Sequence, residues 1–162
     1  MMTKEAIRQT IEMSNMILNS YVGDLVDVDL MKRSVPGVNH IAWQLGHLIS
    51  SERKMLTDAG FPMPDLPNGF AESYTKETSS SDDASKFHKK DEYLAEMAKQ
   101  RRATLSHLEA CTDADLEKPA PEEMQAYAKR YGELFNMIGI HVLMHVGQFV
   151  PVRRMLNKPV TI

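Results

Sequence analysis

Apolar side chains recur at intervals of three and four residues along most of the chain, which is the period of an amphipathic helix. In residues 3–21, the positions that share one helical face are Ile7, Ile11, Ser14, Leu18 and Tyr21. No proline or glycine interrupts this segment, and Gly23 follows it directly. The pattern therefore predicts a first helix over residues 3–21.

A second helix is predicted over residues 38–59, where most positions in the first half are apolar. Pro36 and Gly37 break the chain before this segment, and Asn39 can accept the first free amide hydrogens as an N-cap. Gly60 and Pro62 follow the segment and end the helix.

The stretch from residue 61 to residue 85 has the composition of a loop, with three prolines, a glycine and a run of serines. A loop of about 25 residues is uncommon inside a compact domain and is usually a lid over a site or a disordered linker. Four apolar residues favour a lid, because a pure linker lacks such anchors: Phe61, Leu66, Phe70 and Tyr74.

The second half of the chain predicts two more long helices. Residues 82–111 place an apolar stripe on one face, formed by Leu94, Met97, Ala98, Leu105 and Leu108. Residues 132–156 carry a second stripe, which includes Leu134, Ile138, Val142, Phe149 and Leu156. Pro151 lies inside this last helix and predicts a kink just past His145. Between the two helices, Thr112 and Asp115 resemble the cap of a short helical turn that ends before Pro119.

No strand pair, hairpin signal or internal repeat is found along the chain. Four long amphipathic helices most simply pack as a four-helix bundle. The expected fold is therefore all-α: a single domain over residues 1–162, with a long loop between the second and third helices.

Composition and charge narrow the functional classes. The 162 residues are 43% apolar and 25% charged, which is typical of a globular domain. No apolar run approaches the roughly 18 residues of a membrane span, and the N-terminus lacks the features of a secretory signal. We therefore expect a cytoplasmic protein that does not enter a membrane. The net charge of -3, without a basic block, argues against a nucleic-acid partner.

Histidines are the main source of candidate metal ligands. The single cysteine, Cys111, excludes an internal disulfide and a thiolate zinc cluster, so a metal site would need histidines and carboxylates. His141 and His145 lie one turn apart on the apolar stripe of the last helix, where one helix can offer two nitrogens to one metal ion. The alternative is that each is a core histidine bonded to a carbonyl or hydroxyl. His47 is the best third candidate, although periodicity places it on the flank of its helix.

The remaining polar positions carry weaker signals. His40 is expected to be a solvated residue of the first turn, and His88 and His107 to lie on the surface. Glu52 and Arg101 interrupt the apolar stripes of their helices, either as a buried ion pair or as two separately solvated flanks, and the second is favoured because burial of the pair costs desolvation energy. One turn beyond His145, Gln148 could orient a water at a metal site, or could make an ordinary polar contact.

The runs NHIAWQLGHLI at residues 39–49 and HVLMHVGQFVPVRRMLNKP at residues 141–159 resemble those of the DinB (DNA-damage-inducible) family, within the DinB/YfiT-like superfamily of metalloenzymes. The resemblance covers essentially the whole chain. It implies a four-helix bundle, often a homodimer, that holds a divalent metal, commonly nickel or zinc. Carried over by position, it implies His47, His141 and His145 as the ligands.

Three histidine ligands leave a coordination position open, as in catalytic rather than structural metal sites. The resemblance implies thiol-dependent S-transferase chemistry on a small-molecule substrate. Because Cys111 is expected to be a small buried residue, the sulfur would come from a low-molecular-weight thiol. Metal-dependent hydrolysis is an alternative, weakened by the lack of a carboxylate at a spacing that indicates a general base. The other alternative is a non-catalytic dimeric stress protein with a bound metal.

Overall fold

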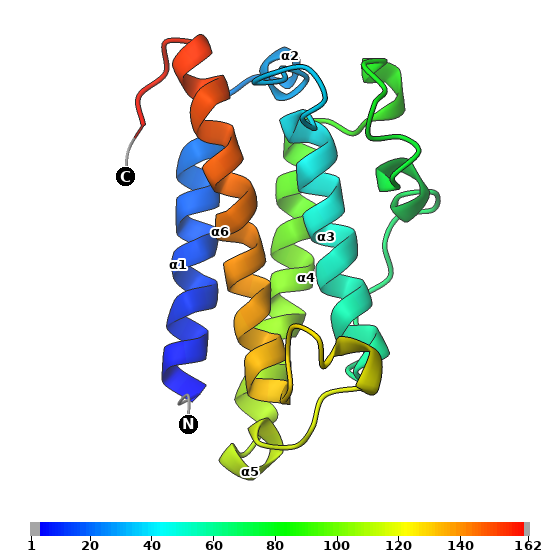
Figure 1. Cartoon of the computed structure of the whole chain (residues 1–162), viewed down its shortest axis with the longest axis vertical. Coiled ribbons are helices and arrows are strands. Elements are labelled where there is room, and N and C mark those ends of the chain that lie inside the picture. The colour runs from blue at the N-terminus through cyan, green and yellow to red at the C-terminus, as the bar shows by residue number, and fades with distance from the viewer. Residues whose placement is uncertain (1–3, 161–162) are drawn as a thin grey trace.

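The computed structural model describes residues 4–160 and consists of helices joined by turns and loops. Four long helices lie side by side: α1 (Lys4–Val22), α3 (Ile41–Asp58), α4 (Lys90–Ala110) and α6 (Tyr131–Met155) (Figure 1). Two single-turn helices connect them, α2 (Asp27–Leu30) and α5 (Asp113–Leu116). The only strand-like pairing in the described residues is an isolated bridge between Pro119 and Arg130. The expected all-α bundle is confirmed; the predicted start of the first helix, at residue 3, lies outside the described residues.

The direction of the helices explains the long connection between α3 and α4. α1 and α6 run up the bundle as drawn in Figure 1, whereas α3 and α4 both run down it. Because two neighbouring helices point the same way, the chain has to travel back along the bundle between them, as crossover connections do in other bundles. The segment carries two short 3₁₀ turns, η1 (Ala71–Tyr74) and η2 (Ala84–Lys86).

The third long helix begins later than predicted, at Lys90 instead of residue 82. The reason is local capping. The Glu92 carboxylate accepts a hydrogen bond of 2.7 Å from the backbone N–H of Lys89, and Asp27 accepts one of 2.8 Å from the N–H of Lys90. Residues 82–89 are instead held with the loop, where Arg33 bonds the Asp82 carboxylate.

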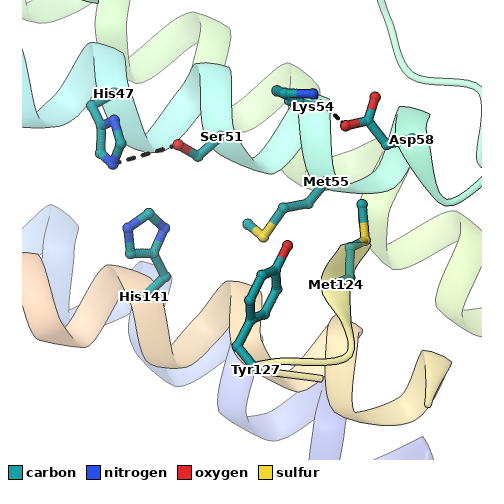
Figure 2. A pocket seen from close by; sticks show the side chains of 8 residues that line it. All are labelled: His47, Ser51, Lys54, Met55, Asp58, Met124, Tyr127 and His141. Atoms are coloured by element: carbon teal, nitrogen blue, oxygen red, sulfur yellow. Dashed lines mark hydrogen bonds and ion pairs between the residues drawn. The ribbon is translucent and has the colours of Figure 1, made fainter. Parts of the chain in front are cut away.

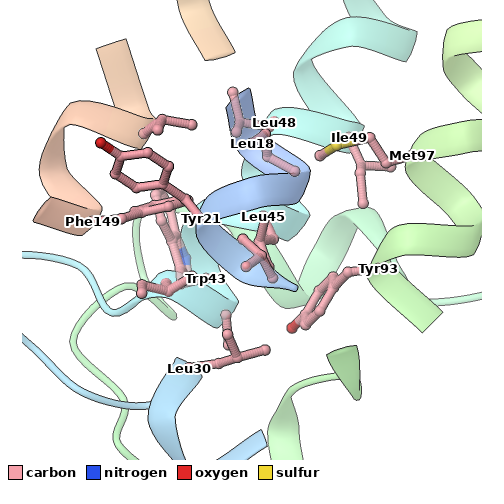
Figure 3. Close-up of a cluster of buried hydrophobic side chains, with 14 of the residues drawn as sticks. Leu18, Tyr21, Leu30, Trp43, Leu45, Leu48, Ile49, Tyr93, Met97 and Phe149 are labelled. Carbon is pink, nitrogen blue, oxygen red and sulfur yellow. The ribbon is translucent and has the colours of Figure 1, made fainter. Parts of the chain in front are cut away.

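The core has a large cluster at the end of the bundle where α3 and α4 begin (Figure 3). Its fully buried members include Leu18, Leu45, Ile49, Tyr93 and Phe149. A second cluster fills the other end, around Ile11, Leu56, Leu108, Phe135 and Ile138. These side chains include most of the predicted apolar stripes, so burial of those stripes holds the four helices together.

α6 is the most apolar helix. Judged by length and composition alone, it is long enough and apolar enough to cross a membrane. Its apolar character has an explanation within the bundle. The helix packs closely along α1, where a Cβ atom at Gly139 would come within 3.0 Å of Thr10. Pro151 stands inside α6, and the helix continues past it to Met155.

The long loop is anchored on α3 by Tyr74, which is 4% exposed. A Cβ atom at Gly46 would lie 2.3 Å from the Tyr74 ring, so the ring packs directly on the α3 backbone. The Tyr74 hydroxyl donates a 2.7 Å hydrogen bond to the Tyr93 hydroxyl and also contacts Nδ1 of His88 at 2.6 Å. Phe70 is also buried, so two of the four predicted apolar anchors are fully inside the fold.

Glu52 and Arg101 form a buried ion pair between α3 and α4, which corrects the prediction of two separately solvated flanks. Nη2 of Arg101 lies 2.9 Å from Oε2 of Glu52, and the two side chains are about as buried as the apolar core. Thr104 donates a further hydrogen bond of 2.6 Å to Oε1 of Glu52. Burial raises the pKa of Glu52, while Arg101 and Thr104 oppose this rise. The hydroxyl and the guanidinium offset part of the desolvation cost on which the prediction rested.

Candidate metal centre

Three histidines from two helices come together between α3 and α6. His47 belongs to α3, and His141 and His145 belong to α6. One nitrogen from each ring can be chosen so that all three lie within 4.8 Å of one another. The Nε2 atoms of His141 and His145 are 3.1 Å apart, because side chains four residues apart lie one above the other on a helix.

His47 lies on the flank of α3, off the apolar stripe of that helix, and the packing around α3 positions its ring. The Trp43 indole stacks on the His47 ring with a centroid distance of 4.9 Å and an angle of 8° between the planes. The indole is itself fixed by the long loop, since Nε1 of Trp43 donates to the Thr75 carbonyl and to Oγ1 of Thr78, each at 3.1 Å. The flank of α3 therefore faces the groove beside α6, and the loop contributes to the orientation of His47.

His145 has a buried polar partner that sequence reasoning missed. Its Nδ1 atom lies 2.8 Å from Oε1 of Gln44, and the Gln44 amide nitrogen donates a 2.7 Å hydrogen bond to the Asn39 carbonyl. With its nitrogen committed to a carbonyl, Gln44 presents its oxygen to His145 as an acceptor. His145 then carries its proton on Nδ1, which leaves the Nε2 lone pair directed at His141. The signal in the sequence is a single glutamine within the apolar run from Ile41 to Ile49.

The other predicted polar residues lie elsewhere. Gln148 is exposed, and no hydrogen bond joins it to the three histidines within residues 4–160. His40 is fully buried, which corrects its prediction as a solvated residue: its Nδ1 accepts from the Trp43 backbone N–H as the N-cap of α3, in place of the expected Asn39. His88 and His107 are half-buried instead of lying freely on the surface, and they bond Tyr74 and the Pro62 carbonyl.

The three imidazoles are neutral at pH 7 in this environment. Burial lowers the pKa of His145 to about 3 and that of His141 to about 4, and it also lowers the pKa of His47. Each added positive charge would also repel the neighbouring rings. Three uncharged nitrogen donors therefore converge with no carboxylate among them.

This all-imidazole donor set fits a divalent transition-metal ion. Bonds of about 2.1 Å to a tetrahedral ion place imidazole nitrogens about 3.4 Å apart. The 3.1 Å between His141 and His145 is close to that spacing, and His47 needs only a small side-chain movement to reach it.

The site opens into a cavity of about 330 Å³ between α3, α6 and the segment that precedes α6. Figure 2 shows His47 and His141 at one end of this cavity and Met55, Met124 and Tyr127 farther along it. A cavity of this size holds a small molecule next to the histidines.

The fold and the site define the class: an all-α bundle that brings three histidines of two long helices close enough to bind a metal ion. The sequence model of the DinB superfamily matches residues 10–149, and the chain belongs to this superfamily. A crystal structure described as the conserved protein of locus from Enterococcus faecalis shares the fold. The two chains align with a TM-score of 0.66 and 11% identity over 98% of this chain and 99% of that one. Among curated proteins, none matches this chain significantly in sequence.

Proposed function

We propose that this protein is a divalent-metal-dependent enzyme in which His47, His141 and His145 hold nickel or zinc. The enzyme joins a low-molecular-weight thiol, through its sulfur atom, to a small electrophilic substrate. The observation that carries the proposal is the set of three neutral imidazole nitrogens within 4.8 Å, open to a cavity on one side. Three protein ligands leave a position free, as in catalytic sites.

A metal in this position lowers the pKa of a thiol that reaches it, so that the thiolate is present at neutral pH. The residues of the chain prepare the site for this. Gln44 holds the tautomer of His145, Trp43 holds the plane of His47, and burial keeps all three rings unprotonated.

In the reaction, the thiol releases its proton to solvent and its sulfur forms a bond to the electrophilic carbon. The bond from that carbon to its leaving group breaks, and a halide leaves with the electron pair.

The sulfur does not come from Cys111. This thiol is buried in the far core cluster with Ile11 and Phe135, and burial raises its pKa. The cytoplasm is the compartment that we propose, since it keeps free thiols reduced.

The site assignment is tested by metal analysis. Purified wild type, loaded with nickel or zinc, is compared with a His141→Ala, His145→Ala double variant. We expect close to one metal ion per chain in the wild type and little in the variant. Equal metal content in both proteins would show that the assignment is wrong.

The reaction is tested with L-cysteine and 1-chloro-2,4-dinitrobenzene as the thiol and the electrophile. We expect turnover above the background rate in the loaded wild type and its loss in His145→Ala. Thiol-independent cleavage of 4-nitrophenyl acetate would support a metal-dependent hydrolase instead. Bound metal with neither activity would support a non-catalytic role.

We further propose that the protein forms a homodimer through an exposed apolar face on α1 and α6. Five apolar side chains on these two helices are 36% to 58% exposed: Met13, Met16, Ile140, Leu143 and Met144. No Lys, Arg, Asp or Glu occurs between Glu133 and Arg153, so the exposed side of α6 can pack against an apolar partner surface. A Met144→Asp change is expected to convert the dimer into a monomer in light scattering. A wild type that is already monomeric at high concentration would contradict this.

A further inference from the structure

A second cavity lies between α3 and the long loop. Its volume is about 370 Å³, and its walls include Ser50, Arg53, Thr57, Ala71 and Tyr74. Both cavities are also lined by four residues at helical spacing on α3: His47, Ser51, Lys54 and Asp58. The two cavities therefore flank one helical stripe and both include His47 in their walls.

The residues that line only one of the two cavities differ in chemistry, while the charged pair of Lys54 and Asp58 lines both. The cavity toward α6 has two thioethers near the ring of Tyr127: Met55, which comes from α3, and Met124, which comes from the same segment as Tyr127 (Figure 2). Thioethers and aromatic rings are polarisable and favour flat apolar ligands. The cavity toward the loop has the hydroxyl groups of Ser50 and Thr57 and the guanidinium of Arg53.

Charged side chains of both signs line the loop-side cavity, and of these Arg53 lines this cavity alone, whereas Lys54 and Asp58 also line the other. Lys54 and Asp58 pair with each other, and Arg53 pairs with Asp65, whose side chain is 96% exposed. The Lys54 side chain is 75% exposed. Because exposed pairs are worth little, a ligand with an ammonium and a carboxylate can exchange partners with them at low cost.

We propose that the two substrates bind on opposite sides of the α3 stripe: an amino- and carboxylate-bearing thiol in the loop-side cavity, and an aromatic electrophile in the cavity toward α6. The sulfur and the carbon that it attacks then meet at the histidines. This assignment deepens the proposed function and rests on it. It makes the long loop a wall of the thiol site, and Tyr127 a wall of the electrophile site.

The test measures binding of each ligand separately, so it does not depend on turnover. Trp43 is the single tryptophan of the chain and stacks on His47, so its fluorescence reports a nitroaromatic ring bound nearby. The probe is 1,3-dinitrobenzene, which lacks a leaving group. Binding of L-cysteine is followed in the nickel-loaded protein by its thiolate-to-metal absorption band.

Two variants separate the cavities. Ala71→Phe places a ring in the loop-side cavity, and Tyr127→Ala removes a wall of the other; both positions are exposed, so the fold tolerates the changes. Ala114→Phe, at an exposed position of α5, is the matched control for added bulk. We expect Ala71→Phe to weaken L-cysteine about tenfold and to change the Kd of 1,3-dinitrobenzene by less than about twofold. Tyr127→Ala is expected to do the reverse, and Ala114→Phe to change neither.

The assignment of two separate sites is overturned if L-cysteine and 1,3-dinitrobenzene compete for one site, if each variant weakens both ligands equally, or if neither variant weakens either ligand. Failure of the proposed function has a different signature, namely independent binding of both ligands with no turnover of 1-chloro-2,4-dinitrobenzene. A thiol series adds a second measure. L-cysteine should bind more tightly than cysteamine or 3-mercaptopropionate, which each lack one charged group. Equal affinity of all three would overturn the assignment of a doubly charged thiol.

Discussion

Gln44 and His145 join α3 to α6 through a hydrogen bond of 2.8 Å between Oε1 and Nδ1. Both residues are buried, and the bond selects the tautomer that leaves Nε2 of His145 free to bind a metal. Such partners orient a ligand and raise its basicity, and their loss typically lowers metal affinity by about 10- to 100-fold.

We therefore expect Gln44→Leu to lower the affinity for nickel or zinc by about 10- to 100-fold, as measured by competition with a chelator. Gln148→Leu is the matched control, because the exposed Gln148 makes no hydrogen bond to the histidines in the described part of the chain and should leave metal affinity unchanged. Equal effects of the two changes would mean that the contact with Gln44 does not orient His145. Both alternatives for Gln148 stay predictions: a role in orienting a water predicts lower turnover of Gln148→Leu at unchanged metal affinity, and an ordinary polar contact predicts unchanged turnover.

The buried pair of Glu52 and Arg101 predicts a non-additive effect on stability. Nε and Nη1 of Arg101 have no hydrogen-bond partner within residues 4–160. The carboxylate of Glu52 is therefore the main group that balances the buried positive charge of Arg101. Glu52→Met leaves this charge buried and should lower the free energy of unfolding by about 3–5 kcal/mol. The Glu52→Met, Arg101→Met double variant should lose less than Glu52→Met alone, since it removes both charges.

Urea unfolding of the two single variants and the double variant measures this coupling. Glu12→Gln provides the exposed control: its ion pair with Arg8 lies at the surface, and its removal should cost less than about 1 kcal/mol. Purely additive losses for Glu52→Met and Arg101→Met would show that the two side chains contribute independently to the free energy of unfolding.

His40 predicts a pH dependence of stability. Burial lowers the pKa of His40 to about 4 in the folded protein, while the unfolded chain has a value near 6.5. Between pH 6.5 and pH 4, His40 is therefore protonated to a greater extent in the unfolded state than in the folded state. The stability contribution of neutral His40 is complete above that pH and is lost as the pH falls toward 4, by up to about 1.4 kcal/mol per pH unit.

The measurement compares wild type with His40→Asn between pH 7.5 and pH 4. Asparagine keeps an N-cap acceptor for the Trp43 amide but does not titrate. Because His47, His141 and His145 remain in both proteins, their titration largely cancels in the difference. We expect the stability of wild type to fall relative to the variant as the pH drops. A constant difference across this range would exclude His40 as the source.

Gly46 and Gly147 offer a matched pair of substitutions in two helices. A Cβ atom at Gly46 would meet the Tyr74 ring at 2.3 Å, whereas one at Gly147 meets nothing within 4 Å. Gly46→Ala should therefore destabilise the fold by about 1–3 kcal/mol and loosen the loop from α3. Gly147→Ala should stabilise the protein by about 0.5–1 kcal/mol, because alanine favours a helix interior.

Denaturant unfolding gives both values, and hydrogen exchange of the amides near Tyr74 gives the loop response. Faster exchange there in Gly46→Ala, without a change in Gly147→Ala, is the expected result. Unchanged exchange in Gly46→Ala would show that Tyr74 does not anchor the loop.

Local pattern was sufficient for the four long helices and for the pair His141 and His145. The helical period depends only on the order of apolar and polar residues, and two residues four apart share a face in any helix. The same reasoning located the long loop, because its prolines and serines do not support a helix. It placed the start of the third helix eight residues too early, since the caps at Lys89 and Lys90 involve Glu92 locally and Asp27 from a distant turn.

Only the tertiary structure decided which flank of α3 faces α6. That packing places His47 beside the pair on α6, gives His145 its partner Gln44, and buries His40 as an N-cap. It also joins Glu52 to Arg101 across two helices. A helical period ranks faces by their hydrophobicity, whereas a polar side chain is buried when a partner from another helix meets it, and that meeting depends on how the helices pack. Helical periodicity therefore determined the helices and two of the three histidines, the family resemblance added His47, and only packing shows how the three rings come together.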